Sequence, residues 1–250
     1  MFEERRGHCL TGPIEVRGAQ AGTVLAVHIV SADPGAWGWT AAGVKDNAVN
    51  RALGLSGAAS WLLWEIDAAA GTATSDRGHT VRTSPFLGVI GMPPNEPGQH
   101  STIPPRTAGG GNIDCRDLTA GARLFLPVTV PGARLHLGDG HAAQGDGEVC
   151  GTAIECPMTT EVTLDIVTEA PVPGIHATTP GGRVTFGFDA DLNAAMAHAP
   201  TAMVTWMQDL YDLDRGTATA LASVVVDLRI TQVANETWGV HAVLAHGAVT

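Results

Sequence analysis

The residues best suited to chemistry lie in the stretch 137–155, where acidic side chains and one imidazole stand close together in the sequence. Asp139 and His141 are two residues apart, so in an extended strand both side chains would leave the same face and could bind one ion. Residues 135–182 contain neither arginine nor lysine, so the local sequence supplies no base to neutralise the acids. A divalent cation is therefore one physically reasonable partner, and distant arginines are the other. The four carboxylates of the stretch are Asp139, Asp146, Glu148 and Glu155.

The same stretch has a purely structural interpretation as turns, because the Asp-Gly pairs at 139–140 and 146–147 are ordinary hairpin-turn residues. The mixture of hard oxygens with one imidazole favours a zinc-type hydrolytic site over a turn. A second patch lies upstream, where Asn112 and Asp114 would share a face if the chain is extended. His100 is a further donor in the Pro/Gly-rich loop before them, although a lone histidine in such a loop is commonly solvent-exposed.

A thiol nucleophile is the other chemistry that the sequence allows. Cys150 follows Glu148 by two residues, but its neighbours Val149 and Gly151 favour a small buried strand residue. The four cysteines show no C-x-x-C spacing, which argues against a zinc finger or a thioredoxin-type motif. We expect reduced thiols in a cytoplasmic protein.

The composition excludes several functional classes. The chain has 250 residues, and its 25 acids against 14 bases give a net charge of −11, which is unfavourable for binding nucleic acid or an anionic membrane. Lys45 is the single lysine, so neither a Walker A loop nor an amidase with a catalytic lysine beside serine or cysteine fits. We find no signal peptide and no apolar run long enough to span a membrane.

The elements that position these residues are expected to be mainly strands, because 31 glycines and 15 prolines interrupt the chain. Residues 10–30 predict a hairpin, residues 31–60 read as irregular, and residues 91–112 read as a long loop. Helices are expected at about 190–223, with Pro200 in a first helical turn. Further strands are predicted at 61–66, 86–90, 123–130, 133–137, 148–154, 161–167, 224–233 and 239–244.

Several blocks of sequence together resemble the acetamidase/formamidase family. They are PFLGVIG (85–91), GQHSTIPP (98–105), GGNID (110–114), DL (117–118), LPV (126–128) and GDGHAAQGDGE (138–148), with weaker matches at 10–14 and 227–233. The resemblance implies a mainly β (α+β) fold with β-sandwich-like lobes and a few C-terminal helices, in one domain over residues 1–250. Similar chains begin earlier, so we expect this domain to lack an N-terminal strand segment.

The resemblance also implies a homodimer or higher homo-oligomer that uses a divalent metal ion to hydrolyse short linear amides, such as formamide or acetamide, to carboxylate and ammonia. Zn²⁺ and Ca²⁺ both suit the donor set. Glu148 would act as the general base, and Asn112 or Gln144 would donate to the developing oxyanion. The residues expected to hold the ion are Asp139, His141, Asp114 and His100.

Two alternatives remain at this point. One is a catalytically silent metal-binding β-sandwich that recognises a small ligand, with the carboxylates holding a structural Ca²⁺. The other is an acyl transferase that depends on Cys150 and requires a base near the thiol. Hydrolysis of formamide would separate the amidase from the silent binder, and alkylation of the thiol would test the transferase.

Overall fold

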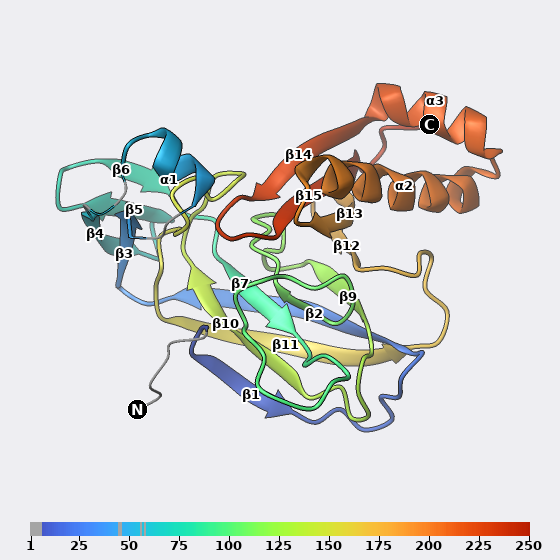
Figure 1. The fold of residues 1–250 in the computed structure, drawn as a ribbon, viewed down its shortest axis with the longest axis horizontal. Helices are drawn as coiled ribbons and strands as arrows, with labels where there is room; N and C mark the ends of the chain where they lie inside the picture. The colour runs from blue at the N-terminus through green and yellow to red at the C-terminus, as the bar shows by residue number, and fades with distance from the viewer. Residues whose placement is uncertain (1–6, 45–46, 56, 58) are drawn as a thin grey trace.

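The computed structural model describes residues 7–44, 47–55, 57 and 59–250, and most of its regular structure is strand. The strands form three antiparallel sheets, with one short helix near one end of the molecule and two longer helices at the other (Figure 1). The predicted mainly β fold with few helices is confirmed. Lys45 lies outside the described residues.

The first sheet has four strands, which are β1 (Leu10–Ile14), β7 (Phe86–Gly91), β8 (Gly110–Asn112) and β10 (Leu135–His141). Their order in the sheet is β1-β10-β7-β8. Every residue of β7 is buried, as expected for a strand that is covered on both faces. Because β10 is hydrogen-bonded on both sides, to β1 and to β7, the strand that contains Asp139 and His141 is held on both edges.

The second sheet has seven strands, which are β2 (Val24–Pro34), β9 (Arg123–Pro127), β11 (Met158–Val167), β12 (His176–Thr179), β13 (Gly182–Asp189), β14 (Val226–Gln232) and β15 (Trp238–Ala245). Their order is β11-β2-β9-β12-β13-β15-β14. In the edge strand β11, exposed residues alternate with partly buried ones over most of its length. This alternation is typical of a strand with one face toward the core and one toward water.

The largest hydrophobic core contains side chains from both of these sheets. The second sheet contributes Leu25 and Ile29 of β2, and the first contributes Ile90 of β7 and Leu135 of β10. The two sheets therefore pack together around one core in a sandwich-like arrangement, and Figure 1 shows β7 and β10 lying over β2 and β11. The site described below lies on strands and loops that this core holds in place.

The two long helices are α2 (Leu192–Tyr211) and α3 (Arg215–Val225). Met203 and Met207 of α2 are fully buried in a cluster that includes residues of β15. Pro200 lies inside α2, so its predicted place in a first helical turn is wrong. An interior proline removes one helical hydrogen bond, and the burial of the apolar face of α2 offsets that loss. Among the described residues, we find no helix that combines the length and the apolar character needed to cross a bilayer.

The third sheet consists of β3 (Trp37–Ala42), β4 (Ser60–Asp67), β5 (Thr72–Ser75) and β6 (Thr80–Arg82), and the short helix α1 (Ala48–Ala52) lies between β3 and β4 in sequence. One face of this sheet packs Trp64 and Ile66 against Ala142 and Ile154. Isolated bridges from Glu155 to Trp39 and to His141 connect the third sheet to β10. Residues 31–60, predicted to be irregular, thus contain regular structure, and that prediction is wrong.

Two further strand predictions are wrong. Residues 10–30 do not form a hairpin, because β1 pairs with β10 whereas β2 pairs with β9 and β11. The turns between β1 and β2 lead the chain from one sheet to the other. Residues 148–154 form turns instead of a strand, and the positive φ angles of Glu148 (46°) and Gly151 (86°) interrupt an extended conformation there.

Candidate active site

His141, the last residue of β10, is buried at the centre of a cluster of acids, of which Asp114 and Glu148 are buried and Asp139 and Glu155 are partly buried. Its Nε2 atom is 3.2 Å from Glu155 Oε2 and 3.5 Å from Asp139 Oδ2. Two groups of ligand atoms share this histidine, each with all atoms within 4.8 Å of one another. The first group is Asp114, Asp139 and His141, and the second is His141, Glu148 and Glu155. We call these five residues the carboxylate cluster.

Three of the clustered acids adopt a left-handed backbone that non-glycine residues rarely use. The φ angles are 52° for Asp114, 62° for Asp139 and 46° for Glu148. Such a conformation costs on the order of 1 kcal/mol or more per residue and persists only where the surrounding structure imposes it. Asp139 is therefore not extended as expected, yet its carboxylate still meets the ring of His141.

Gly88 of β7 leaves the space in which the carboxylates gather. A Cβ atom at this position would lie 2.6 Å from Asp114 Oδ1, 2.6 Å from Asp139 Oδ2 and 2.9 Å from His141 Cε1. The carbonyl oxygen of Gly88 also accepts hydrogen bonds from the backbone N–H groups of Ile113 and Asp114, at 2.9 and 3.1 Å. Gly88 thus both positions the segment that carries Asp114 and leaves room for its side chain.

Gln144 orients His141. Its Nε2 atom donates to the backbone oxygen of Asp114 at 2.7 Å, and its Oε1 atom is 2.9 Å from His141 Nδ1. The backbone oxygen of Asp114 can only accept a hydrogen bond, so it faces the NH₂ group of Gln144, and the oxygen of the Gln144 side chain faces the ring. That oxygen also can only accept, so His141 Nδ1 is assigned as the protonated nitrogen. In the neutral ring, Nε2 then directs a lone pair toward the acids. This is the arrangement in which histidine usually binds a metal.

The electrostatics of the cluster favour a cation. Burial, then the nearby charges of Glu148 and Asp139, hold the pKa of Asp114 well above its usual value. Burial alone would lower the pKa of His141, but the charge of Glu155 and hydrogen bonding to Asp139 and Glu155 raise it well above its usual value. Neither carboxylate oxygen of Asp114 has a hydrogen-bond partner among the described residues, although both are buried. A buried carboxylate in this state requires a proton or a cation, so the donor set fits a divalent ion.

Two residues of the site have no role in the sequence prediction. Glu155 belongs to the acidic stretch but was assigned no role, and its Oε1 atom accepts a hydrogen bond from the backbone of Ala153 at 3.0 Å. The sequence predicts no role for His8, whose Nε2 atom lies 3.6 Å from Asp139 Oδ2. Thr102 holds His8 from its other side, with Oγ1 3.0 Å from Nδ1. The acidic stretch could have indicated Glu155, whereas nothing in the local sequence indicated His8.

The structure does not bring every predicted residue into the carboxylate cluster. His100 is exposed, and its Nε2 atom lies 2.9 Å from the backbone oxygen of Glu96; it belongs to none of the ligand groups of the described chain. Asn112 is buried, and its Nδ2 atom donates to the backbone oxygen of Ile103 at 2.9 Å. Asp146 is exposed. Of the predicted site residues, the carboxylate cluster therefore contains Asp114, Asp139, His141 and Glu148, with Gln144 behind the imidazole.

Cys150 was expected to be a small buried strand residue, and this expectation is wrong. It lies half-buried in a turn, and its Sγ atom is 3.4 Å from the backbone oxygen of Thr152. The described contacts of the thiol are thus to Thr152 and include no histidine.

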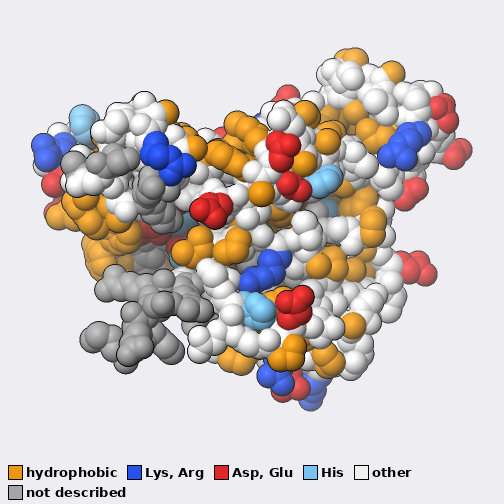
Figure 2. Space-filling view, viewed as in Figure 1, with side chains coloured by type: hydrophobic (Ala, Val, Ile, Leu, Met, Phe, Trp, Pro, Cys, Tyr) orange, Lys and Arg blue, Asp and Glu red, His pale blue; other side chains and the backbone are white. Residues whose placement is uncertain are grey.

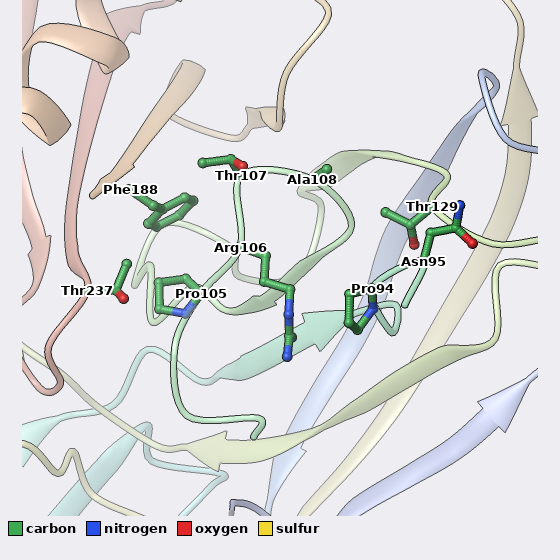
Figure 3. Close-up of a pocket in the computed structure, with 9 residues that line it drawn as sticks. All are labelled: Pro94, Asn95, Pro105, Arg106, Thr107, Ala108, Thr129, Phe188 and Thr237. Carbon is green, nitrogen blue, oxygen red and sulfur yellow. The ribbon is translucent and has the colours of Figure 1, made fainter. Parts of the chain in front are cut away.

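An apolar hollow lies beside the long loop 92–109 (Figure 3). It has a volume of about 520 Å³, and Phe188 and the prolines Pro94 and Pro105 supply part of its wall. Arg106 also lines it, and burial lowers the pKa of this guanidinium. The hollow shares no lining residue with the carboxylate cluster, so it is a separate feature of the surface.

Comparison with known proteins identifies the family of the chain. Residues 2–101 and 95–176 match the model of the Acetamidase/Formamidase family. The chain belongs to this family. A segment of 68 residues is 47% identical to the acetamidase of Mycolicibacterium smegmatis, which corresponds to 26% of this chain and 16% of that protein. The matched segments span a quarter or less of the length of such curated relatives.

Solved structures of the family match over most of the chain. The acetamidase of Bacillus halodurans superposes with a TM-score of 0.85 at 30% identity, covering 94% of this chain and 78% of that one. The acetamidase of Yersinia enterocolitica gives the same TM-score at 26% identity, covering 96% of this chain and 74% of that one. A γ-lactamase of Delftia acidovorans, at 20% identity and a TM-score of 0.60, shares the fold.

Proposed function

We propose that the protein hydrolyses the C–N bond of short linear amides, such as formamide or acetamide, to a carboxylate and ammonia. The observation that carries this proposal is the buried carboxylate cluster, in which both oxygens of Asp114 are unpartnered among the described residues beside an imidazole. Membership of the Acetamidase/Formamidase family supports the same reaction. A site this acidic would be unstable as a purely structural element, because like charges are buried together.

The reaction is proposed to require a divalent metal ion. Asp114, Asp139 and His141 would hold it, and Glu155 lies close enough to His141 to complete the donor set. An ion in this position lowers the pKa of a bound water and polarises the amide carbonyl. Zn²⁺ agrees with the imidazole nitrogen and Ca²⁺ with the number of carboxylates. His100 is left out of the donor set because it is exposed and hydrogen-bonded elsewhere.

Glu148 is proposed as the general base. Its carboxylate would accept a proton from the attacking water and pass it to the amide nitrogen as the C–N bond breaks, so that ammonia leaves. Glu148 is buried, and its carboxylate is close to His141 and Glu155. This position supports the role, because a water activated at the carboxylate cluster would be within reach of Glu148. One water is consumed and one carboxylate is formed for each ammonia released.

Gln144 and Asn112 are the two amides that the sequence predicts as donors to the oxyanion. The amide of Gln144 is engaged with Asp114 and His141, so we assign it to positioning the imidazole. Asn112 donates to Ile103 through Nδ2, an atom that carries two hydrogens. We propose that the second hydrogen serves the developing oxyanion.

The remaining features of the proposal concern assembly and location. We propose self-association as a homodimer or larger assembly, supported by exposed large side chains on the third sheet: Trp37, Leu63 and Trp61 are 58%, 56% and 48% exposed. Figure 2 shows hydrophobic side chains gathered over the region of β3–β6. We propose a single domain, because Glu155 bridges the third sheet to β10. A cytoplasmic location is consistent with four free cysteines.

The test is ammonia release from formamide, acetamide and propionamide. Protein stripped with a chelator and supplied again with Zn²⁺ or Ca²⁺ should regain hydrolysis with one of these ions. Undiminished hydrolysis after exhaustive chelation, with no metal found by elemental analysis, would refute the metal requirement. Metal binding without hydrolysis of any of the three amides would favour the silent metal-binding β-sandwich.

A further inference from the structure

A second group of potential metal ligands shares no residue with the carboxylate cluster. It consists of Cys115, Asp117 and His241, whose ligand atoms all lie within 4.8 Å of one another. Cys115 directly follows Asp114 in the chain, and His241 lies on β15 of the second sheet. The group therefore connects the segment that carries Asp114 to the opposite sheet, and the proposed amide hydrolysis has no use for it.

His241 is the best oriented member of this group. It is fully buried, and its Nδ1 atom is 2.8 Å from the hydroxyl oxygen of Thr231. Its Nε2 atom is also buried, has no hydrogen-bond partner among the described residues and lies 3.8 Å from Asp117 Oδ2. When Nδ1 donates to the Thr231 hydroxyl, Nε2 presents its lone pair to Asp117, which is the arrangement common to metal-binding histidines.

We propose that Cys115, Asp117 and His241 form a second metal site, which takes a thiophilic divalent ion such as Zn²⁺. Sulfur, nitrogen and one carboxylate oxygen are the three ligand types that zinc accepts, and solvent would supply the fourth ligand. Tetrahedral zinc would place the nitrogen and oxygen ligands about 3.4 Å apart. The observed distance between His241 Nε2 and Asp117 Oδ2 is 3.8 Å, so the two side chains would need to move only slightly closer to bind one zinc ion.

The charges around the group determine how the ion would enter. Arg229 Nη1 lies 3.5 Å from Asp117 Oδ2, and Arg229 also pairs with Asp227 through Nη2 at 3.4 Å. The side chains of Asp117 and Arg229 are 24% and 37% exposed, so the arginine can turn toward Asp227 and the ion can reach the carboxylate from solvent. Asp146 supplies a further negative charge near both Cys115 and His241, whereas Arg116 near His241 opposes an incoming cation.

The thiol must lose its proton when the ion binds. Cys115 is fully buried, and burial raises the pKa of its thiol, although a hydrogen bond from the backbone of Asp117 acts in the opposite direction. For each ion bound, a sulfur–metal bond would form and one proton would leave the sulfur, with no change in oxidation state.

The experiment is a Co²⁺ titration of the chelated full-length protein, followed by the near-ultraviolet charge-transfer absorption that a thiolate–cobalt bond produces. The band should appear in the wild type, persist in Cys150→Ser as a matched thiol control, and be lost in Cys115→Ser. It should also persist in His141→Ala, which disables the carboxylate cluster. This last variant separates failure of the second site from failure of the proposed amide hydrolysis.

Absence of the band from the wild type, or its persistence in Cys115→Ser, would overturn the proposal. Should Cys115→Ser fail to fold, Asp117→Asn serves in its place, because Asp117 is partly exposed and its replacement is nearly isosteric. Asp117→Asn should weaken the Co²⁺ affinity measured by this band at least tenfold. An unchanged affinity in that variant would equally refute the site.

Discussion

Substitution of Gly88 by alanine should remove the metal and the activity while leaving the fold largely intact. The new Cβ would lie 2.6 Å from an oxygen of Asp114 and 2.6 Å from an oxygen of Asp139. Ordinary contact begins at 3.4 Å, so each oxygen must retreat by 3.4 − 2.6 = 0.8 Å. Metal sites tolerate errors of only about 0.2 Å in ligand distance, so this displacement is about four times too large.

The effect on stability should be much smaller than the effect on activity. The groups that must move are two carboxylate ends and, by a smaller distance, the edge of the His141 ring, and Gly88 is not in the left-handed region, so alanine is compatible with its backbone. We expect a loss of about 1 kcal/mol in the free energy of unfolding, at the low end for overpacking, and a fall in Tm of about 2–4 °C. Amide hydrolysis should fall by at least about 10²-fold, the effect of misplacing catalytic groups by about 1 Å.

Three measurements on Gly88→Ala test this reasoning: metal content by elemental analysis, a thermal melt, and ammonia release from formamide. Gly145→Ala is the matched control, because a Cβ there meets nothing within 4 Å and the residue lies in the loop after His141. The control should change stability by less than about 0.5 kcal/mol and keep its metal. If Gly88→Ala retains wild-type metal content and turnover, the carboxylates do not hold the ion in the described geometry.

The remaining predictions concern the nucleophile, pH and assembly. His141→Ala should lose metal or turnover by more than about tenfold, whereas Cys150→Ala should keep substantial activity in the same assay; the opposite ranking would favour a thiol mechanism. In metal-free protein, the raised pKa of Asp114 means that the folded state holds its proton longer than the unfolded state, so the stability advantage of the wild type over Asp114→Asn should shrink as pH rises above 3.8. Urea unfolding of both proteins in chelator at several pH values measures this, and an advantage that grows over that range would contradict it. Burial lowers the pKa of His176 to about 4, so the unfolded state gains a proton first and the stability that the neutral His176 contributes should decline as pH falls from 6.5 toward 4. The stability advantage of the wild type over His176→Gln should shrink over that range by up to roughly 3 kcal/mol, and a constant difference would refute the assignment. Sedimentation at micromolar concentration should show an assembly, and a monomer alone would count against self-association.

Local sequence was sufficient to predict that two residues of the candidate site lie together. Asp139 and His141 were placed together from their spacing, and the structure does bring them within 3.5 Å. The reason given was incomplete, because Asp139 has a φ of 62° instead of an extended conformation. The strands at β7, β9 and β11 were also predictable, since apolar runs and alternation depend on neighbours along the chain.

Contacts between distant segments were decided only by the tertiary structure. Asp114 enters the cluster because its backbone is hydrogen-bonded to Gly88, and Glu155 enters because it bridges both Trp39 and His141. The pairing of β1 with β10 is also a contact between distant segments, and the sequence predicted a hairpin of β1 with β2 in its place. The sequence determined that the protein is mainly β, acidic and equipped with carboxylates and an imidazole. Which of those groups meet was decided by the burial of two sheets around a shared core, a balance over the whole chain that local periodicity does not encode.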